Sequence, residues 1–302
     1  MKKIICIGEC SLNIVFNAAG LPVGAMPGGR VVNAAALLAK AGLPVVMASE
    51  ASSDGVGTMV VDFLEKAGVA TASIDRFTEG RTPLNVFTLG PDGRPQLTRY
   101  EKYPPEEGFD IIWPRVEEGD IVIFGGYYAI DPRNHNRMMR FLENAREMKA
   151  LLIYLPGFIP GQEPRITRVM PALLENLELA DMVLTRSDDL SMIFGLDGAQ
   201  CYARNIGFYC RSMVNVDADA RVITYFTDKA SSELPIESNL CRSLIWNAGI
   251  LAGVVRALED IPGGAPALDA PDSTLRGKVL TSAVREADSA AEAIAAPWQE
   301  CE

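Results

Sequence analysis

Two segments of the chain carry residue types that suit contact with a small polar ligand. In the first, Gly28 and Gly29 precede Asn33 at the start of a run of small and aliphatic residues. Glycines let the backbone approach a ligand because they have no Cβ, and an asparagine amide both donates and accepts hydrogen bonds. These residues predict either contact with ligand hydroxyls or a tight turn before a helix. Asn13 is likewise either a ligand contact or a polar group at a strand end.

The second segment lies toward the C-terminus and has the pattern of a buried helix. Small residues recur there at Ala248, Gly249, Ala252 and Gly253. The N-terminus of a helix binds anions through its free N–H groups and its dipole, and glycines there let a phosphate come close. Residues 241–244 are instead Cys, Arg, Ser and Leu. The glycines and the acid that such a site uses are therefore missing.

Composition argues against several other classes of site. The sequence has one histidine and six cysteines without Cys-x-x-Cys spacing, so neither a zinc site nor a Ser-His-Asp triad is expected. Gly-Lys-Ser/Thr does not follow Gly29, and Gly-Val-Gly after Asp54 does not continue as Gly-x-Gly-x-x-Gly. Walker and dinucleotide-binding loops are therefore poorly supported. Scattered cysteines are typical of reduced thiols, which predicts a cytoplasmic location.

Length and charge restrict the partners. The chain has 302 residues, of which 48% are hydrophobic and 22% charged, as expected for a globular protein with a sizeable core. Its formal net charge of -11 argues against nucleic acid and anionic membranes, which need clustered Lys and Arg. No apolar run is long enough to span a bilayer, and the N-terminus lacks the features of a signal peptide. ATP and sugar phosphates need only a local positive site and stay possible ligands.

The elements that must position these residues alternate along the chain. Apolar strands are predicted at 4–8, 44–49, 120–126, 151–155, 181–185 and 221–227. Helices are predicted at 31–42, 57–68, 134–149 and 171–180, from about 240, and within 273–296. Strands without polar alternation, separated by amphipathic helices, indicate a mainly parallel sheet covered on both faces.

One region instead alternates apolar and polar residues. Residues 71–77, 83–90 and 95–102 have the pattern of antiparallel strands with one wet face, and Pro-Asp-Gly-Arg at 91–94 predicts a turn between the last two. Residues 12–17 could join them. We expect one domain over 1–302, with a small sheet formed by strands at approximately 11–25 and 71–103. This sheet is a lid, a dimer contact or a surface hairpin without a role.

The motifs, taken together, resemble the PfkB/ribokinase family of carbohydrate kinases. The segment MPGGRVVNAAALLAKAG resembles the first signature of that family, and DGVG, the Gly-Glu near the N-terminus and Asn247-Ala248-Gly249 resemble further motifs. The resemblance covers essentially the whole chain. It implies a Rossmann-like α/β/α ribokinase-like core with a β lid. It also implies Mg²⁺-dependent transfer of the ATP γ-phosphate to a sugar hydroxyl, and dimerisation through the lid.

The resemblance also shows what is missing. The family has Gly-Ala-Gly-Asp two residues before a block that resembles Asn247-Ala248-Gly249. Leu244 therefore occupies the position of the catalytic aspartate, and Cys241, Arg242 and Ser243 occupy the anion-binding positions. Leucine cannot accept a proton, and loss of a general base costs about 10²–10⁴ in rate. A crowded anion site costs on the order of another 10²–10³. Arg242 could instead attract an anion or be an ordinary surface arginine.

Further family positions are also altered. The aligned residues are Asn13 at the sugar-binding acid, Leu155 and Gly157 at a strand-end acid and Asn, Arg186 and Asp189 at the Asn-x-x-Glu near metal and phosphates, and Tyr225-Phe226-Thr227 at a nucleotide-binding turn. Asn13 keeps hydrogen bonding but not charge. Most of the departures lie on the nucleotide side.

The predicted function is therefore that of a carbohydrate kinase-like protein, a pseudokinase, whose kinase activity is lost or strongly reduced. No catalytic residue and no metal ligand is assigned. The predicted sugar contacts are Asn13, Gly28, Gly29 and Asn33, and the predicted nucleotide or anion contacts are Asp189, Thr227, Cys241, Arg242 and Ser243. ATP and Mg²⁺ are expected for the family, and the altered positions put their binding in doubt.

Two alternatives stay open. The first is an active sugar or nucleoside kinase in which Asp189, Ser243 or a lid residue replaces the base. The second is a sugar-sensing or scaffolding protein that keeps the sugar site and the lid. In each case the expected partners are a sugar or sugar-like small molecule and a second copy of the chain bound through the lid.

Overall fold

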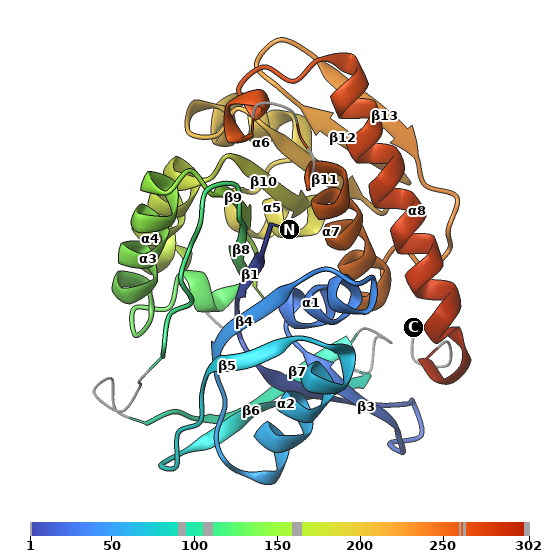
Figure 1. The fold of residues 1–302 in the computed structure, drawn as a ribbon. Coiled ribbons are helices and arrows are strands. Elements are labelled where there is room, and N and C mark those ends of the chain that lie inside the picture. The colour runs from blue at the N-terminus through green and yellow to red at the C-terminus, as the bar shows by residue number, and fades with distance from the viewer. Residues whose placement is uncertain are drawn as a thin grey trace.

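A nine-stranded sheet forms the centre of the molecule, and a four-stranded sheet projects from it (Figure 1). The computed structural model describes residues 2–89, 95–104, 111–158, 165–259, 261 and 264–298. The large sheet has the strand order β13-β12-β11-β10-β9-β8-β1-β4-β5, and the small sheet has the order β3-β2-β6-β7. The predicted α/β class with a projecting β-sheet is confirmed.

The bounds of the elements follow the chain. The strands are β1 (Ile4–Ile7), β2 (Ser11–Phe16), β3 (Pro22–Gly28), β4 (Val45–Glu50), β5 (Ala70–Asp75), β6 (Arg81–Leu89), β7 (Pro95–Lys102), β8 (Ile121–Gly125), β9 (Leu151–Leu155), β10 (Met182–Arg186), β11 (Met213–Asp217), β12 (Val222–Phe226) and β13 (Ser231–Pro235). The α-helices are α1 (Arg30–Lys40), α2 (Gly55–Ala67), α3 (His135–Glu147), α4 (Ile166–Leu179), α5 (Ser187–Phe194), α6 (Gly198–Arg204), α7 (Leu244–Leu258) and α8 (Ser273–Trp298). Short 3₁₀ helices are η2 (Tyr127–Ala129), η3 (Ile206–Phe208) and η4 (Ala265–Leu268).

The large sheet is parallel from β5 to β11, and β12 and β13 complete it in antiparallel pairing. Every residue of β1, β8 and β9 is buried, because helices cover both faces (Figure 1). The apolar cluster on one face includes residues of α1, α2, α7 and α8. The cluster on the other face includes residues of α3, α4, α5 and α6. This is the three-layer arrangement that the continuous apolar strands predict.

The small sheet, which we call the lid, is built from β3, β2, β6 and β7. Asn13 of β2 lies opposite Asn85 of β6, which lies opposite Arg99 of β7. Directly paired residues share a face of a sheet, so these three side chains lie on the same face of the lid. The predicted turn at 91–94 lies outside the described residues.

Two details of the predicted lid are wrong. β5 (Ala70–Asp75) does not belong to the lid, because it pairs in parallel with β4 at the edge of the large sheet. An edge strand has a neighbour on one side only and keeps part of its surface wet, which explains its alternating sequence. The lid strands are also not all antiparallel, since β2 and β6 run in parallel.

Asp54 connects the core to the lid. Its carboxylate caps α2 by accepting a hydrogen bond from Gly57 N at 2.8 Å, as expected for an N-cap aspartate. The same carboxylate accepts from the backbone N and the hydroxyl of Thr82 in β6, both at 3.0 Å. These hydrogen bonds from backbone and side chain lower the pKa of Asp54 against the opposing effect of its partial burial. The lid is thus anchored to the start of a core helix.

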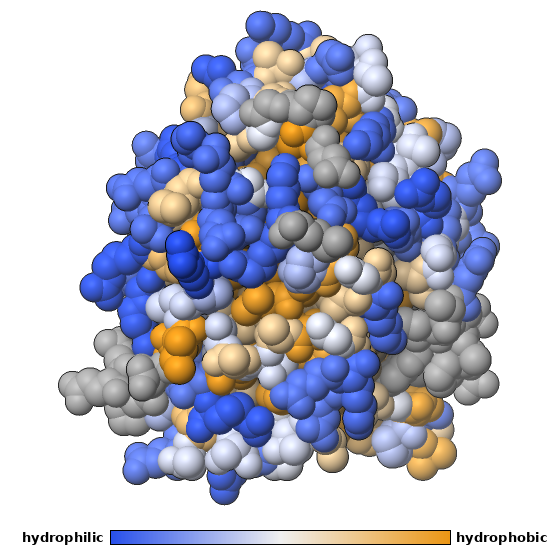
Figure 2. Space-filling view, in the orientation of Figure 1, coloured by the Kyte–Doolittle hydropathy of each residue, from blue (hydrophilic) through white to orange (hydrophobic). Residues whose placement is uncertain are grey.

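Polar residues cover most of the surface seen in Figure 2, and hydrophobic residues gather in the middle of that face. This agrees with the net charge of -11. Within the described part of the chain, no helix combines the length and the apolar character needed to cross a bilayer.

Candidate functional site

A cavity of about 210 Å³ opens at the carboxyl ends of the parallel strands, where ligands bind in open α/β sheets. Residues from the loops after β1 and β8, from the ends of β9, β10 and β11, from the lid and from the starts of α1 and α7 line it. Of the predicted site residues, the cavity brings together Asn13, Gly29, Asn33 and Leu244. The strand order places the ends of β8, β9, β10 and β11 side by side.

The lid side of the cavity is polar. Asn13 Oδ1 accepts a hydrogen bond from Asn85 Nδ2 at 2.9 Å, and Asn85 Nδ2 also lies 3.2 Å from Ser11 Oγ. Asn33 Nδ2 donates to the carbonyl of Pro27 at 3.0 Å. These hydrogen bonds fix the orientation of both amide groups. The amide nitrogen of Asn13 and the side-chain carbonyl oxygen of Asn33 take no part in them and can contact a ligand.

The paired glycines have a geometric reason. A Cβ on Gly28 would lie 2.4 Å from both Asn13 Oδ1 and Ser11 Oγ, so a larger residue would displace the polar groups. Gly29 has a φ of +104°, and a Cβ there would lie 2.3 Å from the carbonyl oxygen of Glu9. Gly29 lines the cavity directly, whereas Gly28 supports it from behind. The structure thus explains why both positions require glycine, and contact of these glycines with a ligand stays a prediction.

The opposite side of the cavity is apolar. Leu244 is the first residue of α7, lines the cavity and is 48% exposed. Ser243 caps this helix, since its hydroxyl accepts a hydrogen bond from Trp246 N at 3.1 Å. Further aliphatic lining on this side comes from Leu155, Leu184, Val216, Ala248 and Ile250, and Val31 of α1 also lines the cavity. The start of α7 therefore presents a hydrocarbon side chain to the cavity.

An ion pair lies at the border of the cavity, where Arg30 lines it. Arg30, at the start of α1, donates from both terminal nitrogens to the two carboxylate oxygens of Asp189 in α5, each at 2.5 Å. A Cβ on residue 157 would lie 2.6 Å from Asp189 Cγ, so Gly157 leaves the room that this carboxylate fills. Asp189 raises the pKa of Arg30 against the opposing effect of burial. The guanidinium therefore stays charged and occupies both oxygens.

The other predicted anion contacts do not line the cavity. The buried Cys241 packs in the core, and Arg242 is exposed and pairs with Asp219. The hydroxyl of Thr227 bonds to the carbonyl and N–H of Ala230. Ser243, as described above, caps α7. The structure thus brings none of these four side chains to the cavity with Leu244.

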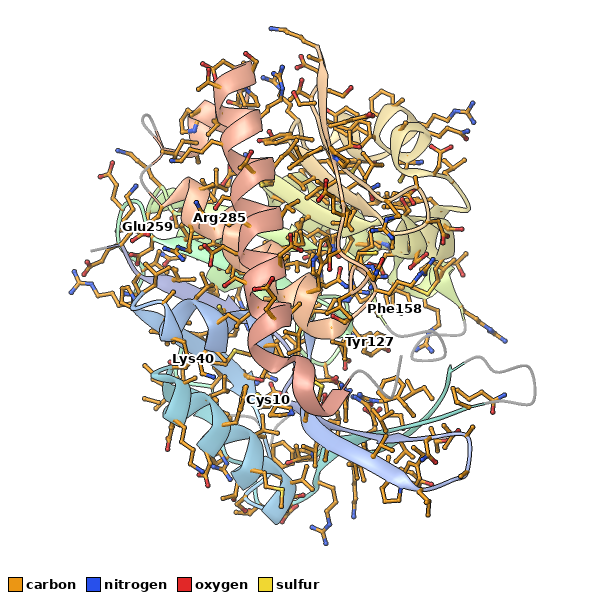
Figure 3. The ribbon with its side chains drawn as sticks, turned by 90° about the vertical axis from the view of Figure 1, so that its right-hand side faces the viewer. Cys10, Lys40, Tyr127, Phe158, Glu259 and Arg285 are labelled. Carbon is orange, nitrogen blue, oxygen red and sulfur yellow. The ribbon has the colours of Figure 1, made fainter. Side chains whose placement is uncertain are left out.

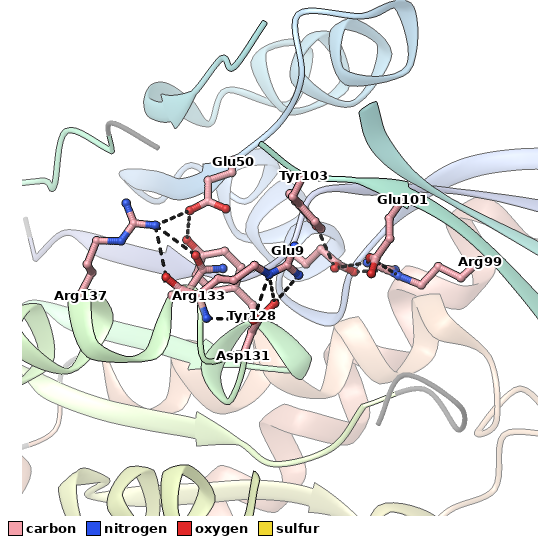
Figure 4. A network of polar contacts seen from close by, with 10 residues as sticks. Glu9, Glu50, Arg99, Glu101, Tyr103, Tyr128, Asp131, Arg133 and Arg137 are labelled. Carbon is pink, nitrogen blue, oxygen red and sulfur yellow. Dashed lines mark hydrogen bonds and ion pairs between the residues drawn. The ribbon is translucent and has the colours of Figure 1, made fainter. Parts of the chain in front are cut away.

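Behind the polar side lies a network of charged residues (Figure 4). Glu9 lines the cavity and is held by Arg99 of the lid and by the hydroxyl of Tyr103, the latter at 3.2 Å. Burial raises the pKa of Glu9, and its pairing with Arg99 opposes this shift. Arg99 Nη1 also donates to Asn85 Oδ1 at 3.0 Å. The network ties the lid to the loop after β1.

A second part of this network surrounds Glu50 at the end of β4. Glu50 accepts a hydrogen bond from the hydroxyl of Tyr128 at 3.2 Å and lies 3.6 Å from Arg137. Its other carboxylate oxygen is buried without a hydrogen-bond partner in the described part of the chain. Burial raises the pKa of Glu50 to about 7, although Arg137 and Tyr128 lower it in part. This group therefore titrates near neutral pH.

The family assignment comes from sequence comparison. The family model for the pfkB family of carbohydrate kinases matches residues 1–205. The chain belongs to this family. Among curated relatives, the pfkB-family chain is 23% identical over 207 residues to probable fructokinase-4 of Arabidopsis thaliana and 22% identical over 208 residues to fructokinase-1 of Oryza sativa. The matched region spans 62% and 64% of the lengths of these relatives.

Solved structures share the fold of this pfkB-family chain. Aminoimidazole riboside kinase from Salmonella enterica, solved with aminoimidazole riboside and an ATP analogue, has a TM-score of 0.77 at 14% identity, over 95% of this chain and 92% of that one. Fructokinase from Xylella fastidiosa with bound ATP has a TM-score of 0.74 at 19% identity, over 98% and 95%. At these identities the likeness establishes a ribokinase-like fold.

The residues of this pfkB-family chain do not fit the Mg²⁺ ion that the family reaction uses. Arg30 occupies both oxygens of Asp189, the acid that the family resemblance places at a metal-side glutamate. Mg²⁺ is normally held by one or two carboxylates together with waters and phosphates. The described ranges contain no group of three or more His, Cys, Asp or Glu side chains placed to hold a metal. The aliphatic side chains around Leu244 cannot hydrogen-bond a triphosphate, and Arg186 and Asn247 are the charged and amide side chains beside them.

Several cavity residues were not predicted from the sequence. They include Glu9, Ser11, Arg30, Asn85, Phe87, Tyr127 and Phe158. Arg186 was named from the family resemblance, but its place on the cavity was not predicted. Tyr127 and Phe158 lie side by side (Figure 3), with ring centroids 6.0 Å apart. Arg30 carried the clearest signal, because it stands between Gly29 and Asn33, which were both predicted.

Proposed function

We propose that this chain binds a sugar or sugar-like polyol in the cavity and that its ATP-dependent phosphotransfer is lost or strongly reduced. The observation that carries the proposal is Leu244, an aliphatic residue at the first position of α7 with its side chain on the cavity. A base at this position would take the proton of the attacking hydroxyl, and its loss costs about 10²–10⁴ in rate.

The phosphate side supports the same proposal. Phosphoryl transfer depends on positive groups that hold the spreading charge of the transition state. Two guanidiniums line the described cavity: that of Arg30 is paired with Asp189, and that of Arg186 at the end of β10 is paired with Asp188 at 2.9 Å. The side chains of Cys241, Arg242 and Ser243 do not line the cavity. Both positive charges at the cavity are therefore already paired with a carboxylate.

An active kinase with a displaced base is the alternative, and Glu9 is the observation that favours it. Glu9 is a carboxylate on the cavity, and its pKa is raised by burial, as suits a general base. Against this role, Arg99 and Tyr103 hold its carboxylate. Asp189 and Ser243 are engaged with Arg30 and Trp246, and the lid residues on the cavity, such as Asn85 and Phe87, are not acids.

The retained polar side favours a binding role, such as sugar sensing. Asn13 and Asn33 keep amide groups toward the cavity, and the paired glycines keep the backbone close. A protein that served only as a scaffold would need neither feature.

Two measurements test the proposal. ADP release is followed with ATP, Mg²⁺ and a panel of pentoses, hexoses and nucleosides, and we expect turnover at least about 10²-fold below the roughly 1–10³ s⁻¹ of typical enzymes. Calorimetry with the same sugars is expected to show binding without ATP. Sugar-dependent ADP release at ordinary rates would refute the loss of activity, and Glu9→Gln would then show whether Glu9 is the base.

A further inference from the structure

The two sides of the cavity differ in chemistry, and the difference follows the strand order. The polar side chains Ser11, Asn13 and Asn85 lie in the lid, beside β1. Most of the aliphatic lining comes from α7 and from the ends of β9, β10 and β11, which lie in that order beyond β8 on the other side of β1. Gly125 and Gly126, at the end of β8, lie between the two sides. A ligand that fills the cavity therefore meets amides at one end and hydrocarbon at the other.

The polar end is prepared for hydroxyl groups. Asn13 and Asn33 are 4% and 5% exposed, and each uses one half of its amide for a bond within the protein. The donor half of Asn13 and the acceptor half of Asn33 are left for a ligand, as far as the described residues extend. A vicinal pair of hydroxyls can accept from one and donate to the other.

The apolar end offers little to a hydroxyl. Two polar residues that border it are partly engaged: Asn247 Nδ2 donates to the carbonyl of Ser243 at 2.7 Å, and Arg186 Nη2 donates to Asp188 at 2.9 Å. The buried Nε of Arg186 is the donor that stays without a partner in the described part of the chain. Leu244, by contrast, is 48% exposed at the start of a helix that is otherwise mostly buried. A ligand group that covers Leu244 gains if it is apolar, and a hydroxyl there would lose its water without a new partner.

We propose that the ligand of this cavity is a monosaccharide with one apolar end, such as a deoxy sugar or a sugar that carries a short alkyl group. Its hydroxyls bind Asn13 and Asn33, and its methyl or alkyl group packs against Leu244, Leu184 and Val216. The methyl or alkyl group of this ligand lies where a kinase substrate has the hydroxyl that accepts phosphate. The inference rests on the proposed function, because it assigns the substrate class of that same site.

The size of the cavity agrees with this ligand class. Its volume of about 210 Å³ is below the roughly 300–1,000 Å³ of common ligand pockets. One monosaccharide with a small substituent fits such a volume, whereas a sugar and a nucleotide together do not. The ion pair of Arg30 with Asp189 borders this space and separates it from the rest of α5.

The test compares matched sugars by calorimetry on the full chain. Each pair contains a hexose and its 6-deoxy counterpart, for example D-galactose with D-fucose and L-mannose with L-rhamnose, together with methyl and propyl glycosides of the same sugars. We expect at least one deoxy or alkyl member to bind about 10–100-fold tighter than its parent, the range that one apolar group contributes in a hydrophobic pocket. Equal or tighter binding of the parent in every pair, or no binding at 10 mM, overturns the proposal.

A variant locates the effect. Leu244→Asn is expected to reduce the preference for the apolar member by about tenfold, because the amide can pair with a hydroxyl. Leu21→Asn makes the same change at a lid position that is 61% exposed and away from the cavity, and it should leave the preference unchanged. Circular dichroism checks that both variants fold. A preference unchanged in Leu244→Asn would show that Leu244 does not contact the ligand.

The outcomes separate this inference from the proposed function. A parent hexose that binds more tightly but is not phosphorylated contradicts only the ligand class. A parent hexose that binds more tightly and releases ADP from ATP contradicts both. A deoxy sugar that binds more tightly and is phosphorylated contradicts only the loss of kinase activity.

Discussion

At the scale of single residues, the ion pair of Arg30 with Asp189 decides the charge of the site. The two terminal nitrogens of one guanidinium meet the two oxygens of one carboxylate, a bidentate geometry in which each oxygen has its own donor. Asp189 is 4% exposed, so water does not replace this partner. A divalent cation would have to displace Arg30 to reach the carboxylate.

We therefore expect the substitution Arg30→Met to create affinity for a divalent cation. Methionine keeps much of the aliphatic length but removes the charge, and this frees both oxygens of Asp189. The measurement is Mn²⁺ binding by electron paramagnetic resonance, in which wild type should bind at least about tenfold more weakly than the variant, a difference of about 1.4 kcal/mol.

Two further variants make this prediction specific. Arg133→Met removes an arginine of similar side-chain exposure, 29% against 30% for Arg30, which pairs with Asp131 in the network of Figure 4. It should not raise Mn²⁺ binding at the cavity. The double variant Arg30→Met with Asp189→Asn should lose the gain. If wild type binds Mn²⁺ and Asp189→Asn abolishes this binding, the prediction is contradicted.

Glu50 leads to a prediction about pH. Its pKa in the folded chain, about 7, lies above its ordinary value of 4.5, so the folded chain binds more protons than the unfolded chain between these values. The free energy of unfolding therefore falls as the pH rises through this window. In Glu50→Gln this contribution is absent, and the fall between pH 5 and pH 8 should be smaller by roughly 2–3 kcal/mol.

Urea unfolding at pH 5, 6, 7 and 8 measures this difference between wild type and Glu50→Gln. The matched control is Asp181→Asn, since burial raises the pKa of Asp181 to about 6 while its hydrogen bond from Leu152 N lowers it. The contribution of Asp181 to the fall in the free energy of unfolding should end at a lower pH than the contribution of Glu50. Parallel curves for wild type and Glu50→Gln would show that Glu50 does not titrate in this window.

The residues differ in how far the sequence could predict them. Gly28, Gly29 and Asn33 lie within one short segment, so local spacing was enough to mark them. The partner of Arg30 is 159 positions away, and only the strand order brings α1 and α5 together. The hydrogen bonds that join Asn13, Asn85 and Arg99 depend on the register of the lid strands, which periodicity alone does not fix.

At the scale of elements, α7 carries Leu244 to the cavity and is itself positioned by α8. Gly249 and Gly253 of α7 face α8 so closely that a Cβ on Gly253 would lie 2.3 Å from the carbonyl oxygen of Ser282 and 2.6 Å from Ala283 Cα. The buried helix that these small residues predicted is thus confirmed. The partner helix could not be identified from them, because small residues suit contact with any close neighbour.

This packing predicts opposite effects for two glycine substitutions. Gly253→Ala should lower the free energy of unfolding by about 1–3 kcal/mol, because the added methyl group overpacks against backbone. Gly277→Ala lies in α8 with nothing within 4 Å of the added Cβ, and it should raise stability by about 0.5–1 kcal/mol through helix propensity. Urea unfolding at one pH measures both, and a Gly253→Ala variant as stable as Gly277→Ala would disprove the close contact.

The β5 error shows where element prediction stops. Its alternating sequence describes a half-wet strand, and both a lid strand and an edge strand of a large sheet meet that description. β1 and β8, by contrast, are buried throughout, and their continuous apolar runs allow one interpretation. Sequence pattern thus identifies how a strand is buried, and pairing decides to which sheet it belongs.

At the scale of the whole molecule, the cavity face of the lid extends beyond the cavity. Val15, Phe87 and Leu97 lie opposite one another in register, on the same face as Asn13, Asn85 and Arg99. They are half-buried in the single chain, so this apolar row is partly exposed to solvent. We propose, as the family resemblance implies, that a second copy of the chain covers this row and that the protein is a dimer.

Leu97 is the residue that tests this assembly. It belongs to the row but does not line the cavity, so Leu97→Glu places a charge in the contact without touching the ligand site. Wild type should sediment as a dimer at about 20 µM, and Leu97→Glu as a monomer, because a desolvated carboxylate without a partner costs several kcal/mol. Phe208→Glu, at a position in η3 that is 78% exposed, should stay dimeric. Monomeric wild type, or a Leu97→Glu variant as dimeric as Phe208→Glu, would place the contact elsewhere or remove it, and the lid would then act within one chain as the cover of its own cavity.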